Sequence, residues 1–413
     1  MATIAILGTM DTKGEEHAFV AEQIKTRGHQ TLVIDVGTLG APLLKPDITR
    51  NEVAISVGAD FEAVVSRHDR GEAIKMMSEG APVVLARLAA EGLIEGVISL
   101  GGGGGTAIGT AAMRALPIGF PKLMVSTLAS GNTAQYVGVK DIVMFPSIVD
   151  VAGLNRISRQ VLTRAAGAIC GMVEAKPQAG EDRPIIVASM FGNTTDCVQA
   201  ARKILEGAGY EVLVFHATGT GGRTMESLIE TGLVAGVLDI TTTEWADELV
   251  GGFLTAGPTR LEAAARMGIP AIVTPGCLDM VNFHAPESVP ARFQGRTFYV
   301  HNPQVTLMRT NAEEGTRLGE VIAGKLNSSK GPATFLIPLR GISVISQPGQ
   351  AFFNQAADEA LFASLKQYLR PGIEVKEVDC SINDPRFAAA CAEGLLENLA
   401  KVKGGIGGPT PGQ

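Results

Sequence analysis

The feature that most constrains this fold is a run of five glycines between an apolar strand and a helix-forming stretch. Residues 97–100 have the composition of a buried strand, residues 101–105 are all glycine, and residues 107–116 favour a helix. Because glycine weakens regular structure wherever another residue would serve, five in succession indicate a backbone that another group approaches closely. A strand–turn–helix order directs unpaired N–H groups toward one point, which suits a phosphate. A flexible turn without a ligand is the alternative interpretation.

Length and composition indicate a globular protein of two domains. A chain of 413 residues is too long for one ordinary hydrophobic core. A composition of 46% hydrophobic and 19% charged residues is typical of a well-buried globular protein. The net charge of -7 disfavours nucleic acid or an anionic membrane as a partner. The five cysteines are odd in number and contain no C-x-x-C, which favours reduced thiols over disulfides or structural zinc. No signal peptide or transmembrane helix is expected, so the sequence predicts a cytoplasmic protein.

The two halves of the chain follow similar patterns. With a constant shift of 181 residues, Ile4 aligns with Ile185 and Gly28 with Gly209, and no gap is needed in this region. The matching lengths favour two similar α/β lobes over one continuous sheet. The segment between them has linker composition, and the C-terminal residues are rich in Gly and Pro. The predicted parts are an N-terminal nucleotide-binding lobe at 1–176, a C-terminal lobe at 184–402 and a flexible tail at 403–413.

Strands and helices alternate along both lobes. In the first lobe, strands are predicted at 3–8, 31–36, 97–100, 122–126 and 141–145, and helices near 14–27, 70–93, 106–116 and 153–173. In the second lobe, strands are predicted at 185–188, 212–215, 234–240, 271–274, 298–301 and 334–337, and helices near 196–206, 223–231, 258–267, 311–325, 355–369 and 384–402. Such alternation is typical of parallel sheets with helices on both faces. The expected fold class is α/β, with two Rossmann-like lobes, mostly parallel sheets and a cleft between the lobes.

Polar residues follow each predicted strand of the first lobe, at the edge where open parallel sheets bind ligands. The candidate nucleotide-binding residues are Asp11, Lys13, Asp35, Gly101, Gly102, Gly103, Gly104, Gly105, Thr106, Ser130, Gly131, Asn132 and Thr133. The glycines and Thr106 would bind phosphate, residues 130–133 would form a second small-residue loop, and Asp35 would bind ribose hydroxyls.

Several of these residues have simpler explanations. Thr12 with Glu15 fits a capping box, which needs no ligand. Lys13 is either a solvated lysine or, because a cation in the first turn opposes the helix dipole, a sign of a nearby anion. Asp35 could merely end its strand, and Asn132 could cap the turn after the fourth strand.

The sequence also limits the class of nucleotide-binding protein. The pattern G-x-x-x-x-G-K-[ST] is absent, which disfavours Walker-type NTPases. A match to G-x-G-x-x-A at residues 102–107 is weak within five glycines, and the next strand ends at Ser126 and Thr127 rather than at an acidic residue for an NAD ribose. The loop resembles those of phosphofructokinase-like and NAD-kinase-like proteins. Gly103 replaces their usual aspartate, which argues against that kinase chemistry.

Four motifs carry a family resemblance, at residues 7–16, 99–106, 129–133 and 144–155. Over essentially its whole length, the chain resembles an uncharacterised bacterial family whose module plants carry as the N-terminal half of the tomato mosaic virus resistance protein. The resemblance implies an ATP-binding domain of two α/β lobes that associates as a homodimer.

The second lobe offers further candidates at the ends of its strands. An arginine there commonly binds a carboxylate or phosphate, although a surface salt bridge is the alternative. The residues expected to border an interlobe cleft with a small anionic substrate are Asp279, His301, Arg309 and Arg340. No H-x-x-x-H or C-x-x-C spacing supports a metal site, and none is predicted. Cys277 as a nucleophile would need a nearby base, so a buried or cleft-lining thiol is favoured, and the role of His284 stays open.

Together these features favour an ATP-binding protein that acts as an ATP-dependent enzyme on a small anionic metabolite. Mg²⁺ could accompany the ATP, and no catalytic residue is identified. The alternative function is a nucleotide-responsive binding or regulatory protein without catalysis. The expected partners are the nucleotide, the substrate and a second copy of the chain, with no nucleic acid and no membrane.

Overall fold

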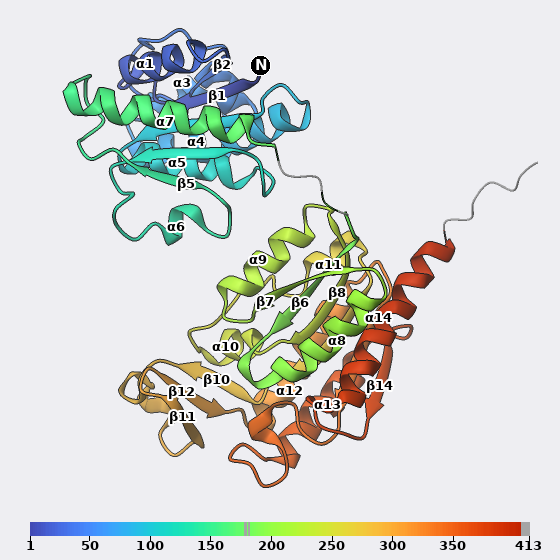
Figure 1. The fold of residues 1–413 in the computed structure, drawn as a ribbon. Helices are drawn as coiled ribbons and strands as arrows, with labels where there is room; N and C mark the ends of the chain where they lie inside the picture. Colours follow the sequence, from blue (N-terminus) through green and yellow to red (C-terminus); the bar gives the residue numbers. More distant parts are fainter. Residues whose placement is uncertain (177–179, 181, 406–413) are drawn as a thin grey trace, which may run out of the picture. The chain divides into compact units, whose positions relative to one another are not determined.

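The computed structural model describes residues 1–176, 180 and 182–405 (Figure 1). The chain divides into two compact units, Met1–Ala179 (unit 1) and Gly180–Gln413 (unit 2), and each is described by itself. The last helix, α14 (Pro385–Gly405), includes the first three residues of the predicted flexible tail. The rest of that tail lies outside the described residues, as do residues 177–179 and 181 of the predicted linker.

Unit 1 contains one parallel sheet with the strand order β2-β1-β3-β4-β5. Its strands are β1 (Thr3–Gly8), β2 (Gln30–Asp35), β3 (Gly96–Gly101), β4 (Lys122–Ser126) and β5 (Val143–Pro146). All five were predicted, and their neighbours pair in parallel register, as in Ile4 opposite Thr31. The fold class predicted for this half of the chain is confirmed.

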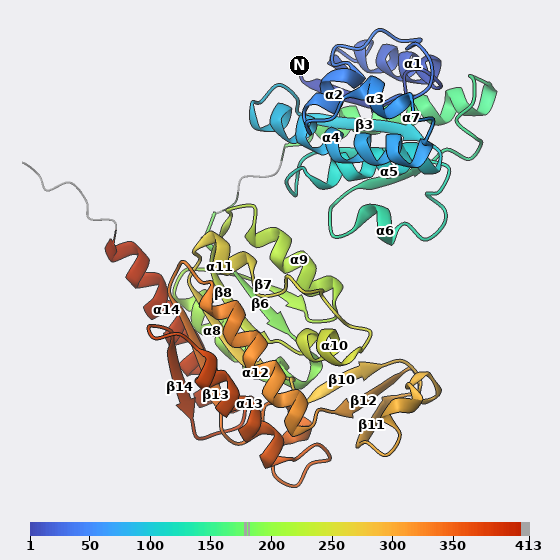
Figure 2. The same cartoon turned by 180° about the vertical axis from the view of Figure 1, so that it is seen from behind.

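Helices cover both faces of this sheet (Figure 2). They are α1 (Gly14–Lys25), α2 (Arg50–Ile55), α3 (Phe61–Val65), α4 (Arg70–Ala90), α5 (Gly103–Arg114), α6 (Ala134–Val137) and α7 (Arg156–Glu174). Successive residues of β1 enter different cores, because side chains of a strand point alternately to opposite faces. Ala5 and Leu7 pack with α2, α4 and α5, whereas Ile4 and Ile6 pack with α1 and α7.

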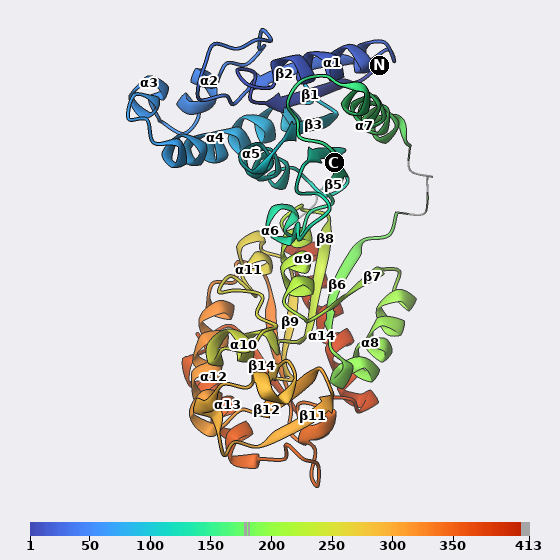
Figure 3. The same ribbon diagram turned by 90° about the vertical axis from the view of Figure 1, so that its left-hand side faces the viewer.

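Unit 2 contains a parallel sheet and a smaller antiparallel one (Figure 3). The parallel sheet has the order β14-β13-β9-β8-β6-β7, and the antiparallel sheet has the order β10-β12-β11. The strands are β6 (Ile185–Met190), β7 (Glu211–His216), β8 (Val234–Thr241), β9 (Ala271–Gly276), β10 (Met280–Phe283), β11 (Phe298–Asn302), β12 (Val305–Arg309), β13 (Ala333–Pro338) and β14 (Glu374–Val378). The strand predicted at 298–301 therefore belongs to the antiparallel sheet, where it pairs with β12.

The helices of unit 2 follow the predicted alternation, with additional short elements. They are α8 (Thr195–Gly207), α9 (Thr220–Ile229), α10 (Glu244–Val250), α11 (Ala263–Met267), α12 (Ala312–Asn327), α13 (Gln355–Tyr368) and α14, with 3₁₀ turns η1 (Gly192–Thr194), η2 (Pro286–Ser288), η3 (Ala291–Phe293) and η4 (Val344–Ser346). Among the described residues, no helix is both long and apolar enough to span a membrane.

The repeated pattern in the sequence corresponds to a repeated β-α-β unit. β1, α1 and β2 begin unit 1, and β6, α8 and β7 begin unit 2, with both strand pairs parallel. Gly28 and Gly209 both have positive φ, 86° and 91°, where each helix turns into the following strand. Glycine adopts this backbone conformation without a steric cost, which explains why both positions carry it.

Candidate functional site

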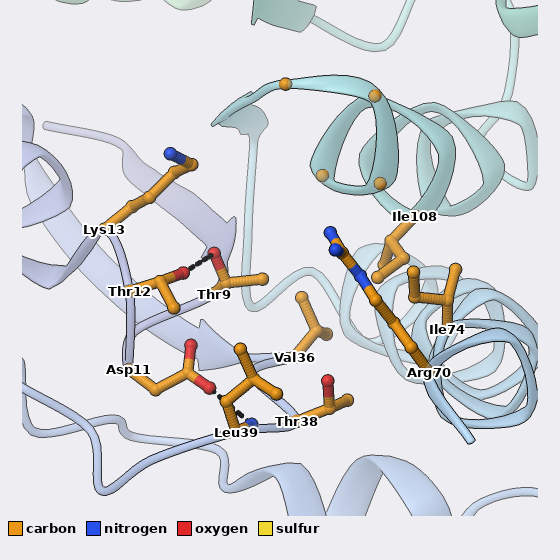
Figure 4. Close-up of a pocket in the computed structure, with 14 residues that line it drawn as sticks. Thr9, Asp11, Thr12, Lys13, Val36, Thr38, Leu39, Arg70, Ile74 and Ile108 are labelled. Carbon is orange, nitrogen blue, oxygen red and sulfur yellow. Dashed lines mark hydrogen bonds between the residues drawn. The ribbon is translucent and has the colours of Figure 1, made fainter. Parts of the chain in front are cut away.

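A cavity of about 300 Å³ lies beyond the carboxyl ends of β1, β2 and β3 in unit 1 (Figure 4). We call it the switch-point cavity, because the chain leaves β1 for β2 on one side of it while β3 pairs with the other side. Ligands of open α/β sheets bind at such a point. Its walls are formed by Thr9, Asp11, Thr12, Lys13, Val36, Thr38, Leu39, Arg70, Ile74, Gly102, Gly103, Gly104, Gly105 and Ile108.

The glycine run provides the start of a helix rather than only a loop. α5 begins at Gly103, three residues before the predicted start, and its N-cap residue Gly102 makes no side-chain cap. The first N–H groups of a helix have no partner within the helix, and here no acidic residue of the first turn offsets them. Gly102 to Gly105 therefore present unpaired backbone donors and the positive end of a helix dipole to the cavity.

Individual glycines of this run are required for different reasons. A Cβ added at Gly101 would lie 2.8 Å from the Cα of Gly105, so the tight turn into α5 excludes a side chain there. A Cβ added at Gly104 would lie 3.3 Å from Cδ1 of Ile74, whereas one at Gly103 would have nothing within 4 Å. The protein has no steric need for glycine at Gly103, where the missing side chain leaves the cavity open.

Thr106 supports the turn instead of lining the cavity. The residue is fully buried, and its hydroxyl lies 2.7 Å from the hydroxyl of Ser126 on β4. This contact connects the start of α5 to the neighbouring strand. The predicted direct contact of Thr106 with phosphate therefore has no support in this geometry.

Two cationic side chains line the switch-point cavity. Lys13 donates to the carbonyl oxygen of Val151. Arg70, in the first turn of α4 after the N-cap residue Asp69, extends toward the start of α5 (Figure 4). Within the described part of the chain, the Arg70 guanidinium has neither an ion pair nor a hydrogen bond. Arg70 is exposed, and because a cation in a first helical turn opposes the dipole, an anion bound beside it would offset this repulsion.

Two carboxylates hold the loops that form the cavity floor. Asp35 is 1% exposed, and its Oδ1 accepts hydrogen bonds from the N–H groups of Met10 (3.0 Å) and Gly37 (2.8 Å). Burial raises the pKa of Asp35. Asp11 Oδ2 accepts from the N–H groups of Leu39 (2.7 Å) and Gly40 (3.3 Å). Asp11 lines the cavity and Asp35 does not, so Asp35 supports the surrounding loops without lining the cavity itself.

Sequence patterns missed part of this site and misread another part. The predicted capping box at Thr12 is wrong: the N-cap of α1 is Lys13, and the hydroxyl of Thr12 donates to that of Thr9 at 3.0 Å. Arg70 and the apolar wall were missed. A basic residue directly after the capping Asp69 is a signal of the same kind as the one that identified Lys13, and it could have identified Arg70.

The predicted second loop lies at a separate hollow of about 360 Å³ on the same edge of the sheet. Its lining residues are Ser126, Thr127, Ser130, Pro146, Ser147, Ile148, Val149 and Asp150. Gly131, Asn132 and Thr133 line neither this hollow nor the switch-point cavity. Asn132 Oδ1 accepts from the N–H of Ala134 at 3.1 Å, which stabilises the start of α6.

The four substrate candidates of unit 2 do not form one surface. Asp279 and Arg309 are buried, whereas His301 and Arg340 are exposed. Arg309 donates to the carbonyl oxygen of Phe352 (2.7 Å) and to Asp358 (2.6 Å), so its guanidinium is used within the fold. The neighbouring charge of Arg309 also affects Asp279, although burial dominates and raises the pKa of that carboxyl.

Arg340 is the surface salt-bridge partner of Asp379, which is the alternative considered for it. Cys277 is fully buried with φ of 60°, and burial raises the pKa of its thiol well above the usual value, which disfavours a nucleophilic role. The ring of His284 stacks on Phe253 with 3.8 Å between centroids. In the described ranges, no group of three or more His, Cys, Asp or Glu residues is placed to hold a metal ion.

A buried charge network occupies the carboxyl end of β8 in unit 2. Arg260 is 1% exposed and donates to both oxygens of Asp239 (2.6 and 2.7 Å) and to Glu244 (2.7 Å). Glu244 also accepts from the N–H groups of Gly219 (2.7 Å) and Gly222 (3.1 Å). Arg260 follows Glu244 by 16 residues and Asp239 by 21, and these spacings form no recognised motif from which the network could be predicted. Its hydrogen bonds indicate a structural role.

Comparisons with known proteins identify close relatives along the whole chain. A UPF0261 protein of Clostridium tetani (strain Massachusetts / E88) is 51% identical over 96% of this chain and 99% of its own length. A second, from Mesorhizobium japonicum, is 48% identical over 95% of this chain and 98% of its own length. The ToMV resistance protein Tm-1(GCR237) of Solanum lycopersicum is 38% identical over 95% of this chain, which spans 55% of the plant protein.

The solved structures that match this chain are distant in both sequence and structure. A putative UDP-N-acetylglucosamine 2-epimerase from Listeria monocytogenes shares 12% identity and a TM-score of 0.24, over 66% of this chain and 78% of that one. Residues 2–178 and 183–399 match the N-terminal and C-terminal domains of one uncharacterised protein family. With these matches and its bacterial relatives, the chain belongs to the UPF0261 family.

Proposed function

We propose that unit 1 binds ATP in the switch-point cavity and that the protein is an ATP-dependent enzyme. The observation that carries the proposal is the meeting of three anion-binding features in one cavity. These are the uncapped N-terminus of α5, the side chain of Lys13 and the unpartnered guanidinium of Arg70. Backbone N–H groups and arginine are the groups that proteins use most effectively for phosphate.

The remaining walls suit the rest of a nucleotide. Val36, Leu39, Ile74 and Ile108 form an apolar side, and Leu39 is 71% exposed although it is a large apolar residue. A base bound there would cover this surface, and hydroxyl groups on the cavity wall would be available to the ribose. The volume of about 300 Å³ lies at the lower end of the range for small-molecule sites.

A magnesium ion brought in by the nucleotide would meet one carboxylate in the wall of this cavity. Asp11 is the acidic residue of the wall, and its Oδ1 is buried without a hydrogen-bond partner. A carboxylate oxygen is a ligand that Mg²⁺ prefers, and the ion would neutralise phosphate charge. Asp11 is the residue that would hold it.

Calorimetric titration of the full-length protein with ATP tests the binding proposal. Arg70→Ala removes a charge-assisted contact, for which about 1.5–3 kcal/mol is typical, so the Kd should rise by about tenfold or more. The matched control is Arg67→Ala, because Arg67 lies three residues before Arg70, in the turn after α3, and pairs with Glu72 outside the cavity. Both variants should unfold thermally like the wild type. Equal ATP affinity in both variants, or no ATP binding by the wild type, contradicts the proposal.

The second candidate function is a nucleotide-responsive binding protein without catalysis, and a homodimer is compatible with either. Phosphorus-31 NMR of the protein with ATP and pooled metabolites separates the two functions. An enzyme converts ATP to a new phosphorus species, whereas a binding protein leaves ATP unchanged. Analytical ultracentrifugation with and without ATP measures the oligomeric state.

A further inference from the structure

The second hollow of unit 1 adjoins the switch-point cavity. We call it the hydroxyl hollow, defined by residues Ser126, Thr127, Ser130, Pro146, Ser147, Ile148, Val149 and Asp150. Gly102 of the cavity lies next to Thr127 of the hollow, because a Cβ added at Gly102 would be 3.8 Å from the Thr127 hydroxyl. The N–H of Thr127 also donates to the carbonyl of Gly101 at 3.3 Å. A molecule in the hollow would therefore lie beside the glycine run.

Some polar groups of the hydroxyl hollow are already used by the protein. Ser126 Oγ contacts Thr106 and accepts from the N–H of Leu128 (3.0 Å), and the Ser147 hydroxyl donates to the carbonyl of Val149 (2.7 Å). The side chains of Thr127, Ser130 and Asp150 have no hydrogen-bond or ion-pair partner within the described part of the chain. Three solvent-exposed polar side chains from two different loops thus line one hollow and are available to a ligand.

The charge of the hollow is opposite to that of the switch-point cavity. Its lining includes the carboxylate of Asp150 and contains no Lys, Arg or His. An anionic ligand would meet an unbalanced negative charge there. A ligand with hydroxyl or amino groups would instead donate hydrogen bonds to the Asp150 carboxylate. It would also form hydrogen bonds with the hydroxyls of Thr127 and Ser130, which can donate or accept.

The rim of the hollow carries an unusual backbone. Ile148 is 75% exposed and has φ of 66°, a conformation that β-branched residues rarely adopt. The N–H of Val149 donates to the carbonyl of Ser147 at 2.7 Å, which fixes this tight turn. Strained, exposed apolar residues of this kind occur at ligand clamps.

We propose that the hydroxyl hollow is the substrate site of unit 1 and that it takes a small molecule with hydroxyl or amino groups and no negative charge. The assignment of the hollow as a substrate site rests on the proposed ATP site, because a molecule in the hollow would lie beside the phosphates of the ATP. It differs from the sequence-based expectation, which is a small anionic metabolite in an interlobe cleft. Asp150 and Ser130 bind the donor groups of this molecule, and Ile148 covers its apolar side.

Labelling with cationic and anionic thiol reagents tests, in the full-length protein, whether the hollow favours positive over negative charge. The five native cysteines are buried, so Ser130→Cys supplies an accessible thiol. We expect a methanethiosulfonate with an ammonium group to react about fivefold faster than one with a sulfonate, because a nearby carboxylate attracts the cation and repels the anion. Asp150→Asn should reduce this preference to near equality, and Asp196→Asn on the exposed start of α8 should not. Equal rates, or a faster sulfonate reagent, overturn the proposal.

Ligand binding is tested by saturation-transfer NMR with glycerol, D-ribose and ethanolamine as probes and acetate and citrate as anionic comparators. At least one of the three probes should bind, and Asp150→Asn should reduce its signal severalfold. Glycerol and D-ribose report a polyol site, and ethanolamine reports an amine site. Binding of the anions alone, or no binding by the three probes, overturns the proposal. The probes are titrated without nucleotide, and ATP binding is measured separately by calorimetry. A failure of the substrate proposal can therefore be distinguished from a failure of the ATP proposal.

Discussion

Replacing Gly103 with alanine separates the needs of the fold from those of the proposed ligand. A Cβ at this position has nothing within 4 Å, so the protein accommodates the methyl group without movement. Gly103 is the first residue of α5, and alanine is a better helix former than glycine. The free energy of unfolding should therefore stay unchanged or rise by up to roughly 1 kcal/mol.

The same methyl group occupies space that a phosphate needs to reach the N–H groups of α5. If one charge-assisted hydrogen bond is lost, ATP binding weakens by about 2 kcal/mol. This corresponds to a Kd roughly 30-fold higher. The variant is thus expected to be at least as stable as the wild type and much weaker in binding.

Urea unfolding and ATP calorimetry on the same preparation measure both effects. The matched control is Gly171→Ala in α7, where an added Cβ also meets open space but the residue lies outside the cavity. The control should keep the wild-type affinity for ATP. A folded Gly103→Ala variant with wild-type affinity would refute the assignment of phosphate to the start of α5.

Two further predictions concern unit 2. Arg260→Ala leaves the carboxylates of Asp239 and Glu244 buried without their cation, and urea unfolding should show a loss of about 3–5 kcal/mol; a loss no greater than that of the exposed control Arg340→Ala would contradict this reasoning. Burial raises the pKa of Asp247 from 3.8 to about 7. Because the folded-state pKa is the higher one, its contribution to stability is complete below about pH 4 and is lost as the pH rises through 7. Urea unfolding between pH 5 and pH 8 should show this decline in the wild type and a smaller decline in Asp247→Asn, and equal slopes would count against it.

The strands of unit 1 were predictable because both faces of the sheet are covered. The first four strands are then short apolar runs that each end at a glycine or a polar residue, as β3 does at Gly101. The repeated β-α-β unit was visible because Gly28 and Gly209 mark equivalent turns. These signals are local, and they depend on few distant contacts.

The antiparallel sheet of unit 2 was harder to predict. β10 and β12 are short, and their apolar residues belong to clusters that include α13 and the turn η4, which lie later in the chain. Arg309 shows the same difficulty, since its partner Asp358 is 49 residues away. Its position at a strand end indicated an exposed ligand-binding arginine, and only the three-dimensional packing shows that it is an internal crosslink.

The sequence predicted the loops of the candidate site but not that they line two separate hollows. The glycine run, Asp11 and Lys13 meet in one cavity, whereas Ser130 lines another. The sequence shows that both loops follow neighbouring strands of a parallel sheet. It does not show that the loops line two separate hollows, because that depends on side-chain packing.

The carboxylates of Asp11 and Asp35 have a thermodynamic consequence for any ligand of the switch-point cavity. Their hydrogen bonds to Met10, Gly37 and Leu39 fix the loops after β1 and β2 before a ligand arrives. The entropy lost in ordering these loops therefore belongs to the folding reaction rather than to the binding reaction. A nucleotide entering such a preorganised cavity would bind with little change in heat capacity beyond that of its own buried apolar surface.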